Sequence, residues 1–359
     1  MESSYDVVVV GAGIGGLTTA ALLSARGMNV CLFERQSQVG GCIARVEFSG
    51  YEFEPGMGLY ASFGPGGIYE KLFSQLPVDA PPVSPLASPY VLRGSDGSDV
   101  PLTREDPYSI AGGPASLAER LAESIKLSGG KVRLNSPVLR LAYDESGRAT
   151  GVDLLSGERV FARKIVSNLT VWDTYGKLVG LNRTPAEIKK RVNAVRGTGV
   201  YVVYASIEEA AVARLPAERM LVKDNLGEFT LAIAGRRAAT FTTRTDVEPW
   251  FSYQSSEEDY DEWDQSALGE FWNRLHAALP ELGGDIEVIE TANPRTYYDV
   301  TRRKLGMVLG IEEAAETFSA RTFLPNLFIV GDTVSDSATI DSVVASAISL
   351  VNQDFSRQP

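Results

Sequence analysis

The first candidate functional motif is a glycine-rich run near the N-terminus. It reads Gly11-Ala12-Gly13-Ile14-Gly15-Gly16 and has the pattern G-x-G-x-x-G. In this pattern the first glycine permits a tight turn from a strand into a helix, and the second lets the backbone approach a pyrophosphate. The third lets the helix pack closely on the strand. Unpaired N–H groups at the start of that helix then bind the phosphates, so the run predicts a dinucleotide site.

The segments around this run have the periodicity that such a site requires. Residues 5–10 are apolar and β-branched, which predicts a buried parallel strand. Residues 16–26 predict a helix, and residues 29–33 predict a second strand that ends at Glu34. A carboxylate in that place accepts hydrogen bonds from the hydroxyls of the adenosine ribose. Together these segments predict a βαβ unit.

A second motif at the far end of the chain distinguishes FAD from NAD. A predicted strand at residues 326–330 ends in Gly331-Asp332, and a predicted helix at residues 340–351 follows. Asp332 can hold a ribityl hydroxyl, and the N-terminus of the helix can stabilise negative charge on a reduced flavin. An NAD site needs no such second motif. The two motifs together therefore predict FAD.

Several segments carry a family resemblance. Residues 5–55 resemble the N-terminus of the flavin amine oxidase superfamily, and most of all its phytoene desaturase and carotenoid isomerase branch. Residues 135–138, 165–168, 294–310 and 331–347 resemble further segments of that branch. The resemblance implies FAD bound without a covalent link. Motifs and resemblance together assign the cofactor to Gly11, Gly13, Ile14, Gly15, Gly16, Glu34, Arg35, Gly40, Gly41, Cys42, Arg45, Gly56, Met57, Val138, Asn168, Gly331, Asp332 and Ile340.

The chain also departs from the family's pattern. Cys42 stands where the family often has Arg, Glu54 replaces the usual Asp, and residues 335–339 lack the family's glycines. Cys42 is either a redox-active thiol near the flavin or a small apolar residue at a tight turn. We favour the second, because nothing nearby in the sequence marks a lowered thiol pKa. The segment before Val138 is much shorter than in carotenoid desaturases, which predicts a substrate smaller than a carotenoid.

The pattern of strands and helices predicts an α/β fold with two lobes. A Rossmann-type FAD-binding domain is assigned to residues 1–70, 108–195 and 305–359. A mixed-sheet substrate lobe is assigned to residues 71–107 and 196–304, which contain several strand-like runs. The acidic run at residues 256–264 is expected to be a solvated loop, and the helix that follows it carries the sole histidine, His276.

Composition excludes several classes of protein. The net charge of −12 disfavours nucleic acid as a partner and opposes binding to anionic lipid. The two cysteines and one histidine predict no metal site and no disulfide scaffold, so we expect a cytoplasmic protein. Residues 7–25 carry no charge, but Glu2 and Asp6 precede them and glycines interrupt them. We therefore expect neither a signal peptide nor a transmembrane segment there.

These observations predict an FAD-dependent oxidoreductase that transfers a hydride from a small, largely apolar substrate to flavin N5. One alternative is a flavin amine oxidase with an aromatic pair facing the flavin, for which Tyr297, Tyr298 and Trp250 are candidates. Others are a carotenoid or isoprenoid desaturase or isomerase, and a non-catalytic flavin-bound protein. The catalytic residues, the electron acceptor and the oligomeric state stay open. Arg302, Arg303 and Lys304 either line a substrate entrance or face solvent.

Overall fold

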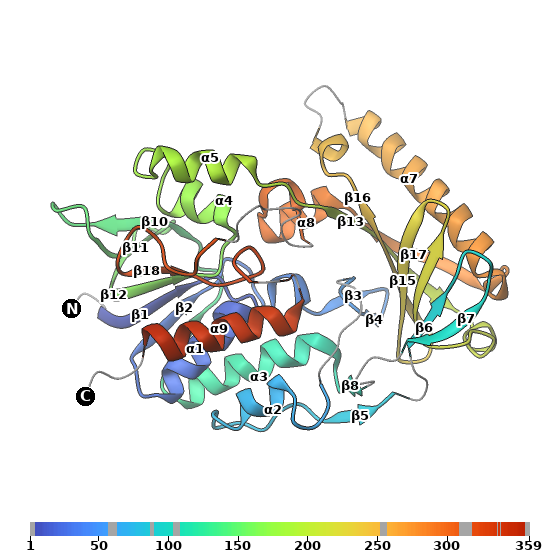
Figure 1. The fold of residues 1–359 in the computed structure, drawn as a ribbon, viewed down its shortest axis with the longest axis horizontal. Helices are drawn as coiled ribbons and strands as arrows, with labels where there is room; N and C mark the ends of the chain where they lie inside the picture. The colour runs from blue at the N-terminus through green and yellow to red at the C-terminus, as the bar shows by residue number, and fades with distance from the viewer. Residues whose placement is uncertain are drawn as a thin grey trace.

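The computed structural model describes residues 4–56, 63–86, 90–102, 108–251, 257–308, 318–335, 337 and 339–355. These residues form two lobes, each built on one seven-stranded sheet (Figure 1). The predicted α/β class, with one Rossmann-type lobe and one mixed-sheet lobe, is confirmed.

The first lobe has a parallel sheet at its centre. Its strands follow the order β10-β11-β12-β1-β2-β9, and β18 pairs with the end of β12. Neighbours are parallel except for the meander from β10 to β12. The strands are β1 (Ser4–Val10), β2 (Val30–Phe33), β9 (Lys131–Arg133), β10 (Val138–Tyr143), β11 (Ala149–Leu154), β12 (Arg159–Ser167) and β18 (Leu327–Ile329).

Helices cover both faces of this sheet because each presents an apolar stripe to it. On one face lie α1 (Ile14–Ala25), α2 (Ile68–Phe73), α3 (Gly113–Leu127) and α9 (Ile340–Asp354) (Figure 1). On the other face lie α4 (Val171–Asp173), a π-helical turn at Thr174–Leu178 and α5 (Ala186–Ala194). The predicted strand–turn–helix–strand unit at the N-terminus is thus present as β1, α1 and β2.

The second lobe is a mixed sheet of order β17-β13-β16-β15-β14-β6-β7. Only β14 and β6 run parallel, and the other neighbours are antiparallel. The long helix α7 (Glu257–Ala278) covers one face (Figure 1). The strands are β6 (Tyr90–Arg93), β7 (Asp99–Leu102), β13 (Gly199–Ile207), β14 (Arg219–Asp224), β15 (Gly227–Ala234), β16 (Ala238–Thr245) and β17 (Ile286–Ala292).

Smaller elements complete the two lobes. They are the strands β3 (Val46–Phe48), β4 (Tyr51–Phe53), β5 (Val83–Pro85) and β8 (Tyr108–Ile110), the helices α6 (Glu209–Val212) and α8 (Pro294–Thr301), and short 3-10 turns at Gly41–Ile43, Glu248–Phe251, Pro280–Leu282 and Lys304–Gly306. α2 crosses the predicted domain boundary at residue 70, and its Leu72 and Phe73 are buried in the core of the first lobe. The exact domain boundaries stay a prediction.

One expectation is wrong. The acidic run was expected to be a solvated loop that leads into a helix N-terminus, but α7 already begins at Glu257, so residues 257–264 lie in its first two turns. The physical reason is that negative side chains near a helix N-terminus stabilise the helix instead of ending it. The ring nitrogens of His276, further along α7, lie 3.0 Å from the carbonyl oxygens of Trp272 and Gly283, which gives this residue a structural role.

Gly16 is the position where the close packing of α1 on β1 can be tested. A Cβ atom there would lie 2.2 Å from the carbonyl oxygen of Gly11, so the backbone of the turn would have to move. We expect Gly16→Ala to lower the free energy of unfolding by about 1–3 kcal/mol. The control is Gly269→Ala in α7, where nothing lies within 4 Å of the added Cβ. That change should stabilise the helix by up to about 1 kcal/mol. Urea denaturation measures both, and equal stabilities would contradict the packing argument.

Candidate active site between the lobes

A cavity of about 820 Å³ lies between the two lobes. The carboxyl ends of β1, β2 and β12 form one wall, and strands β13 to β16 form the opposite wall. Open α/β sheets bind their ligands at the carboxyl ends of the parallel strands, and the volume is that of a ligand site. The predicted residues that line it are Gly11, Gly13, Ile14, Gly15, Glu34, Arg35, Gly40, Gly41, Cys42, Val138, Asn168, Gly331, Asp332 and Ile340.

Four predicted residues do not line this cavity in the described structure. Gly16 lies behind the turn, where it serves helix packing. Arg45 is held by ion pairs with Glu52 and Glu119, so we remove it from the proposed cofactor site. A Cβ on Gly56 would lie 2.9 Å from the side chain of Val202 in β13, so Gly56 is a close contact between the lobes. Met57 lies outside the described residues.

Asn168 connects the strand ends that form the floor of the cavity. It follows β12, and its backbone N–H donates to the carbonyl oxygen of Val10 in β1 at 2.8 Å. Its side-chain Nδ2 donates to the carbonyl oxygen of Val330, just after β18, at 3.0 Å. One residue therefore ties together three strands that come from widely separated parts of the chain.

The side chain of Asn168 also explains why glycines surround it. A Cβ on Gly13 would lie 2.6 Å from Oδ1 of Asn168, and a Cβ on Gly15 would lie 3.0 Å from its Nδ2. A Cβ on Gly331 would lie 3.1 Å from the same Nδ2. Both glycine motifs therefore leave room for one amide as well as for a ligand. The sequence assigned these glycines to the cofactor alone, because the place of Asn168 among them is a tertiary feature.

Glu34 fixes the glycine turn from the end of β2. One carboxylate oxygen accepts the backbone N–H of Ala12 and the other accepts that of Gln36, both at 2.8 Å. A carboxylate has about four acceptor sites, so each oxygen can still accept a hydroxyl. The geometry therefore fits an adenosine ribose at this place, as the sequence predicted, and adds a structural role.

The double role of Glu34 gives a test. Glu34→Ala should weaken FAD binding at least about 10-fold, because it removes charge-assisted hydrogen bonds to both ribose and turn. It should also lower the melting temperature of the protein prepared without FAD, since the bond to Ala12 is lost. The matched control is Glu47→Ala, on an exposed residue of β3. FAD titration and thermal melts measure the effects. An FAD affinity unchanged from the parent protein would refute the ribose assignment.

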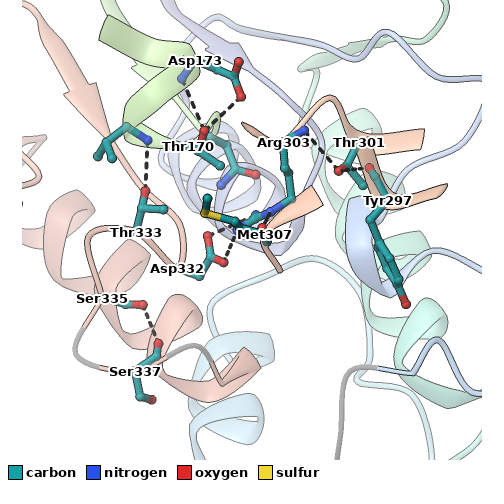
Figure 2. A network of polar contacts seen from close by, with 12 residues as sticks. Thr170, Asp173, Tyr297, Thr301, Arg303, Met307, Asp332, Thr333, Ser335 and Ser337 are labelled. Atoms are coloured by element: carbon teal, nitrogen blue, oxygen red, sulfur yellow. Dashed lines mark hydrogen bonds and ion pairs between the residues drawn. The ribbon is translucent and has the colours of Figure 1, made fainter. Parts of the chain in front are cut away.

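A buried ion pair lies on the cavity wall beside the C-terminal motif. Arg303 donates to Asp332 through Nη1 at 3.2 Å and Nη2 at 2.5 Å, and its Nε donates to the carbonyl oxygen of Met307 (Figure 2). Only 14% and 16% of the two side chains are exposed. Burial alone would lower the pKa of Arg303, but the charge of Asp332 raises it above its ordinary value, so the guanidinium group stays charged. Asp332 thus reaches the cavity with its orientation fixed.

Nothing in the sequence ranks Arg303 above its two cationic neighbours. Arg302 pairs with Asp299 on the surface, and the Nζ of Lys304 lies 5.6 Å from the ring centroid of Trp172. Only Arg303 of the three lines the cavity. A cation next to a predicted cavity carboxylate was the signal, but Arg303 and Asp332 are 29 positions apart, so the sequence does not show that they are neighbours.

Cys42 lies on the cavity wall next to the guanidinium group of Arg303. Burial raises the pKa of its thiol, and the nearby Arg303 offsets only part of that rise. Cys31 is buried within β2, and burial raises its pKa to about 11. Both thiols are therefore protonated at neutral pH. This environment supports the interpretation of Cys42 as a small residue at a turn and argues against a thiolate.

The raised pKa values predict how the thiols react. Because only the thiolate is nucleophilic, the folded protein with FAD bound should react slowly with Ellman's reagent at pH 7.5. Because the pKa is raised and not lowered, the rate at Cys42 should still increase with pH above pH 9. The same protein in guanidinium chloride serves as the control and should give two thiols quickly. Rapid reaction of one thiol per protein at pH 7, with a rate that reaches its plateau below pH 9, would show that Cys42 is an activated thiol.

The aromatic candidates for an amine-oxidase site lie elsewhere. The hydroxyl of Tyr297 donates to the carbonyl oxygen of Pro55 at 3.1 Å. Tyr298 packs edge-on against Phe251, and Trp250 stacks on Tyr201 at 5.7 Å between ring centroids. None of the three candidates lines the cavity. They therefore form no aromatic pair at the site.

Comparison with known families identifies the chain. Residues 9–76 match the model of an NAD(P)-binding Rossmann-like domain, and residues 90–352 match that of flavin containing amine oxidoreductases. The second match covers more than half of the chain. The chain belongs to the family of flavin containing amine oxidoreductases. Its cofactor is FAD, and by family this member is an FAD-dependent oxidoreductase.

Individual relatives agree with this family. Prolycopene isomerase of Daucus carota is 23% identical over 215 residues, which are 54% of this chain and 34% of the isomerase. An oxidoreductase of Methanosarcina mazei has a TM-score of 0.71 at 15% identity, with 97% of this chain and 100% of that chain covered. A putrescine oxidase variant has a TM-score of 0.68 at 14% identity, with 98% of both chains covered. The two structural matches show that the fold is shared.

The match to the prolycopene isomerases covers only part of those proteins. This chain spans about a third of the length of the prolycopene isomerases that it matches. In the part of the chain that the structure describes, no helix has the length and the apolar character needed to cross a bilayer.

Proposed function

We propose that this family member binds FAD non-covalently across the cavity and uses it to oxidise a small, largely apolar substrate. The observation that carries the proposal is the single cavity that joins the two glycine motifs to the strands of the second lobe. FAD fits this cavity at two places. Glu34 keeps acceptor sites for the ribose, and Asp332 presents a fixed carboxylate near Gly331.

When bound, FAD supplies a hydride acceptor at its N5 atom. The residues of this chain would bind the cofactor, orient the substrate and shield both from water. Backbone N–H groups at the start of α1 would hold the pyrophosphate, because Gly13 and Gly15 bring the backbone to the cavity surface. The N-terminus of α9, which begins at Ile340, would stabilise negative charge at the reduced cofactor. Strands β13 to β16 would place the substrate on the opposite side and exclude water.

The size of the second lobe supports a substrate smaller than a carotenoid. Its wall over the cavity is one face of a single sheet, formed by strands β13 to β16. A cytoplasmic location also stays a proposal, and the two free cysteines support it. Amine oxidation is less well supported, because the three aromatic candidates lie away from the cavity.

Anaerobic flavin reduction tests the proposed function. Acid precipitation should first release the yellow FAD into the supernatant, since we propose no covalent link. The intact holoprotein should then lose its flavin absorbance on mixing with short isoprenoid substrates, and not with phytoene or with amines such as putrescine. Dithionite reduces the flavin chemically and serves as the control. Colour retained in the pellet would refute non-covalent binding. Rapid reduction by phytoene would favour a carotenoid desaturase, and a flavin that only dithionite reduces would favour an isomerase or a non-catalytic protein.

A further inference from the structure

The wall of the cavity formed by the second lobe has an organised pattern of side chains. Successive residues of a strand point to opposite faces of a sheet, so every second residue of β15 and β16 faces the cavity. Phe229 points to the other face, where its ring packs edge-on against Phe271 of α7 at 5.4 Å. Its neighbour Thr230 therefore points toward the cavity, and by the same alternation Thr242 of β16 does so too.

These two threonines lie directly opposite each other in the sheet. Thr230 of β15 pairs with Thr242 of β16, and the same row continues to Leu221 of β14 on one side. Val202 of β13 pairs with Thr242 on the other side, and the row continues to Ala292 of β17 and Leu92 of β6. In such a row the side chains of neighbouring strands lie within contact distance. Two adjacent hydroxyls thus lie in the row with an aliphatic residue on each side of them.

The hydroxyls of Thr230 and Thr242 have no hydrogen-bond partner among the described residues. The adjacent row on the same face behaves differently. Thr240 donates to the carbonyl oxygen of Glu54 at 3.0 Å, and Arg219 pairs with the carboxylate of Glu54 at 2.6 Å. The contacts of that row link the two lobes. Thr242 is buried, with its Oγ1 only 3.3 Å from where a Cβ on Gly56 would lie, and Thr230 is half-buried. Both residues line the cavity, so a molecule bound there can supply the missing partner.

The charged groups of this face lie outside the threonine row. Glu228 and Arg244 are each two residues further along their strands, and both side chains are exposed at the cavity rim. Within the row itself the neighbours are aliphatic, Leu221 beside Thr230 and Val202 beside Thr242. The two hydroxyls therefore have no charged neighbour in their own row, and the nearest charges belong to the rows on either side.

We propose that Thr230 and Thr242 form a substrate subsite that binds one uncharged oxygen group, a hydroxyl or a carbonyl, of an otherwise apolar molecule. A threonine hydroxyl both donates and accepts, so a pair of them serves either group. This inference rests on the proposed function and narrows its substrate class. It places pure hydrocarbons and charged amines among the molecules that the site rejects, because a hydrocarbon leaves both hydroxyls unpaired and an ammonium group finds no counter-charge in the row.

Equilibrium binding to the holoprotein tests the subsite without turnover. The probes are two matched pairs, benzyl alcohol with toluene and octanol with octane, together with benzylamine. Perturbation of the oxidised flavin spectrum reports binding at the cavity. We expect each alcohol to bind more tightly than its hydrocarbon, and benzylamine to bind more weakly than benzyl alcohol. In the double variant Thr230→Val with Thr242→Val, alcohol affinity should fall about 2- to 10-fold for each hydroxyl removed, while hydrocarbon affinity stays constant or rises.

The control variant is Thr150→Val, which makes the same change on β11, away from the cavity. It should leave every affinity unchanged. The flavin spectrum and melting temperature of each variant show whether it is folded with FAD bound, and the single variants replace the double one if it is not. The inference is overturned if neither alcohol binds more tightly than its hydrocarbon, or if the variants keep the preference of the parent protein. Such a result would leave the proposed redox function standing, because that function is judged by flavin reduction and not by binding.

Discussion

The position of Asn168 is the constraint on which the rest of the site depends. Its backbone N–H donates to Val10, the last residue of β1, and its side chain donates to Val330, just after β18. Its side-chain amide fills the space beside the glycines of both motifs. A larger residue at Gly13, Gly15 or Gly331 would displace it. The pyrophosphate turn and the C-terminal motif are therefore not two independent sites. They meet at one side chain, and the distance between them is set by its hydrogen bonds.

Polar contacts between the two lobes frame the cavity, beside an apolar cluster that packs Phe53 against Val202 and Tyr204. Arg219 of β14 reaches Glu54 of the first lobe, and both side chains are almost completely buried. Nη2 of Arg35 donates to the carbonyl oxygens of Asp299 and Val300 at the end of α8, at 2.7 and 2.8 Å. Buried charges are stable only when they are paired and well oriented. These contacts therefore hold the second sheet at a defined position over the strand ends of the first.

The cavity that results has different chemistry on its two sides. The first lobe offers backbone N–H groups, a carboxylate at Glu34 and the ion pair of Asp332 with Arg303, which suit a charged and hydroxylated cofactor. The second lobe offers aliphatic side chains and two hydroxyls, which suit a weakly polar substrate. A family member of this kind can change its substrate by altering one face of the second sheet. The cofactor side need not change, because its contacts come from the other lobe.

The local structure around the dinucleotide turn follows from the sequence alone. The run from Gly11 to Gly16, the strand before it and Glu34 after it lie within one βαβ unit, so their spacing alone predicted the dinucleotide turn. The side-chain contacts between distant segments follow only from the tertiary fold. The pairing of Arg303 with Asp332, the bonds of Asn168 and the row through Thr230 and Thr242 depend on strand register and on how the lobes meet. Sequence periodicity reports which face of a strand is buried, but it carries no information about which strand lies next to it.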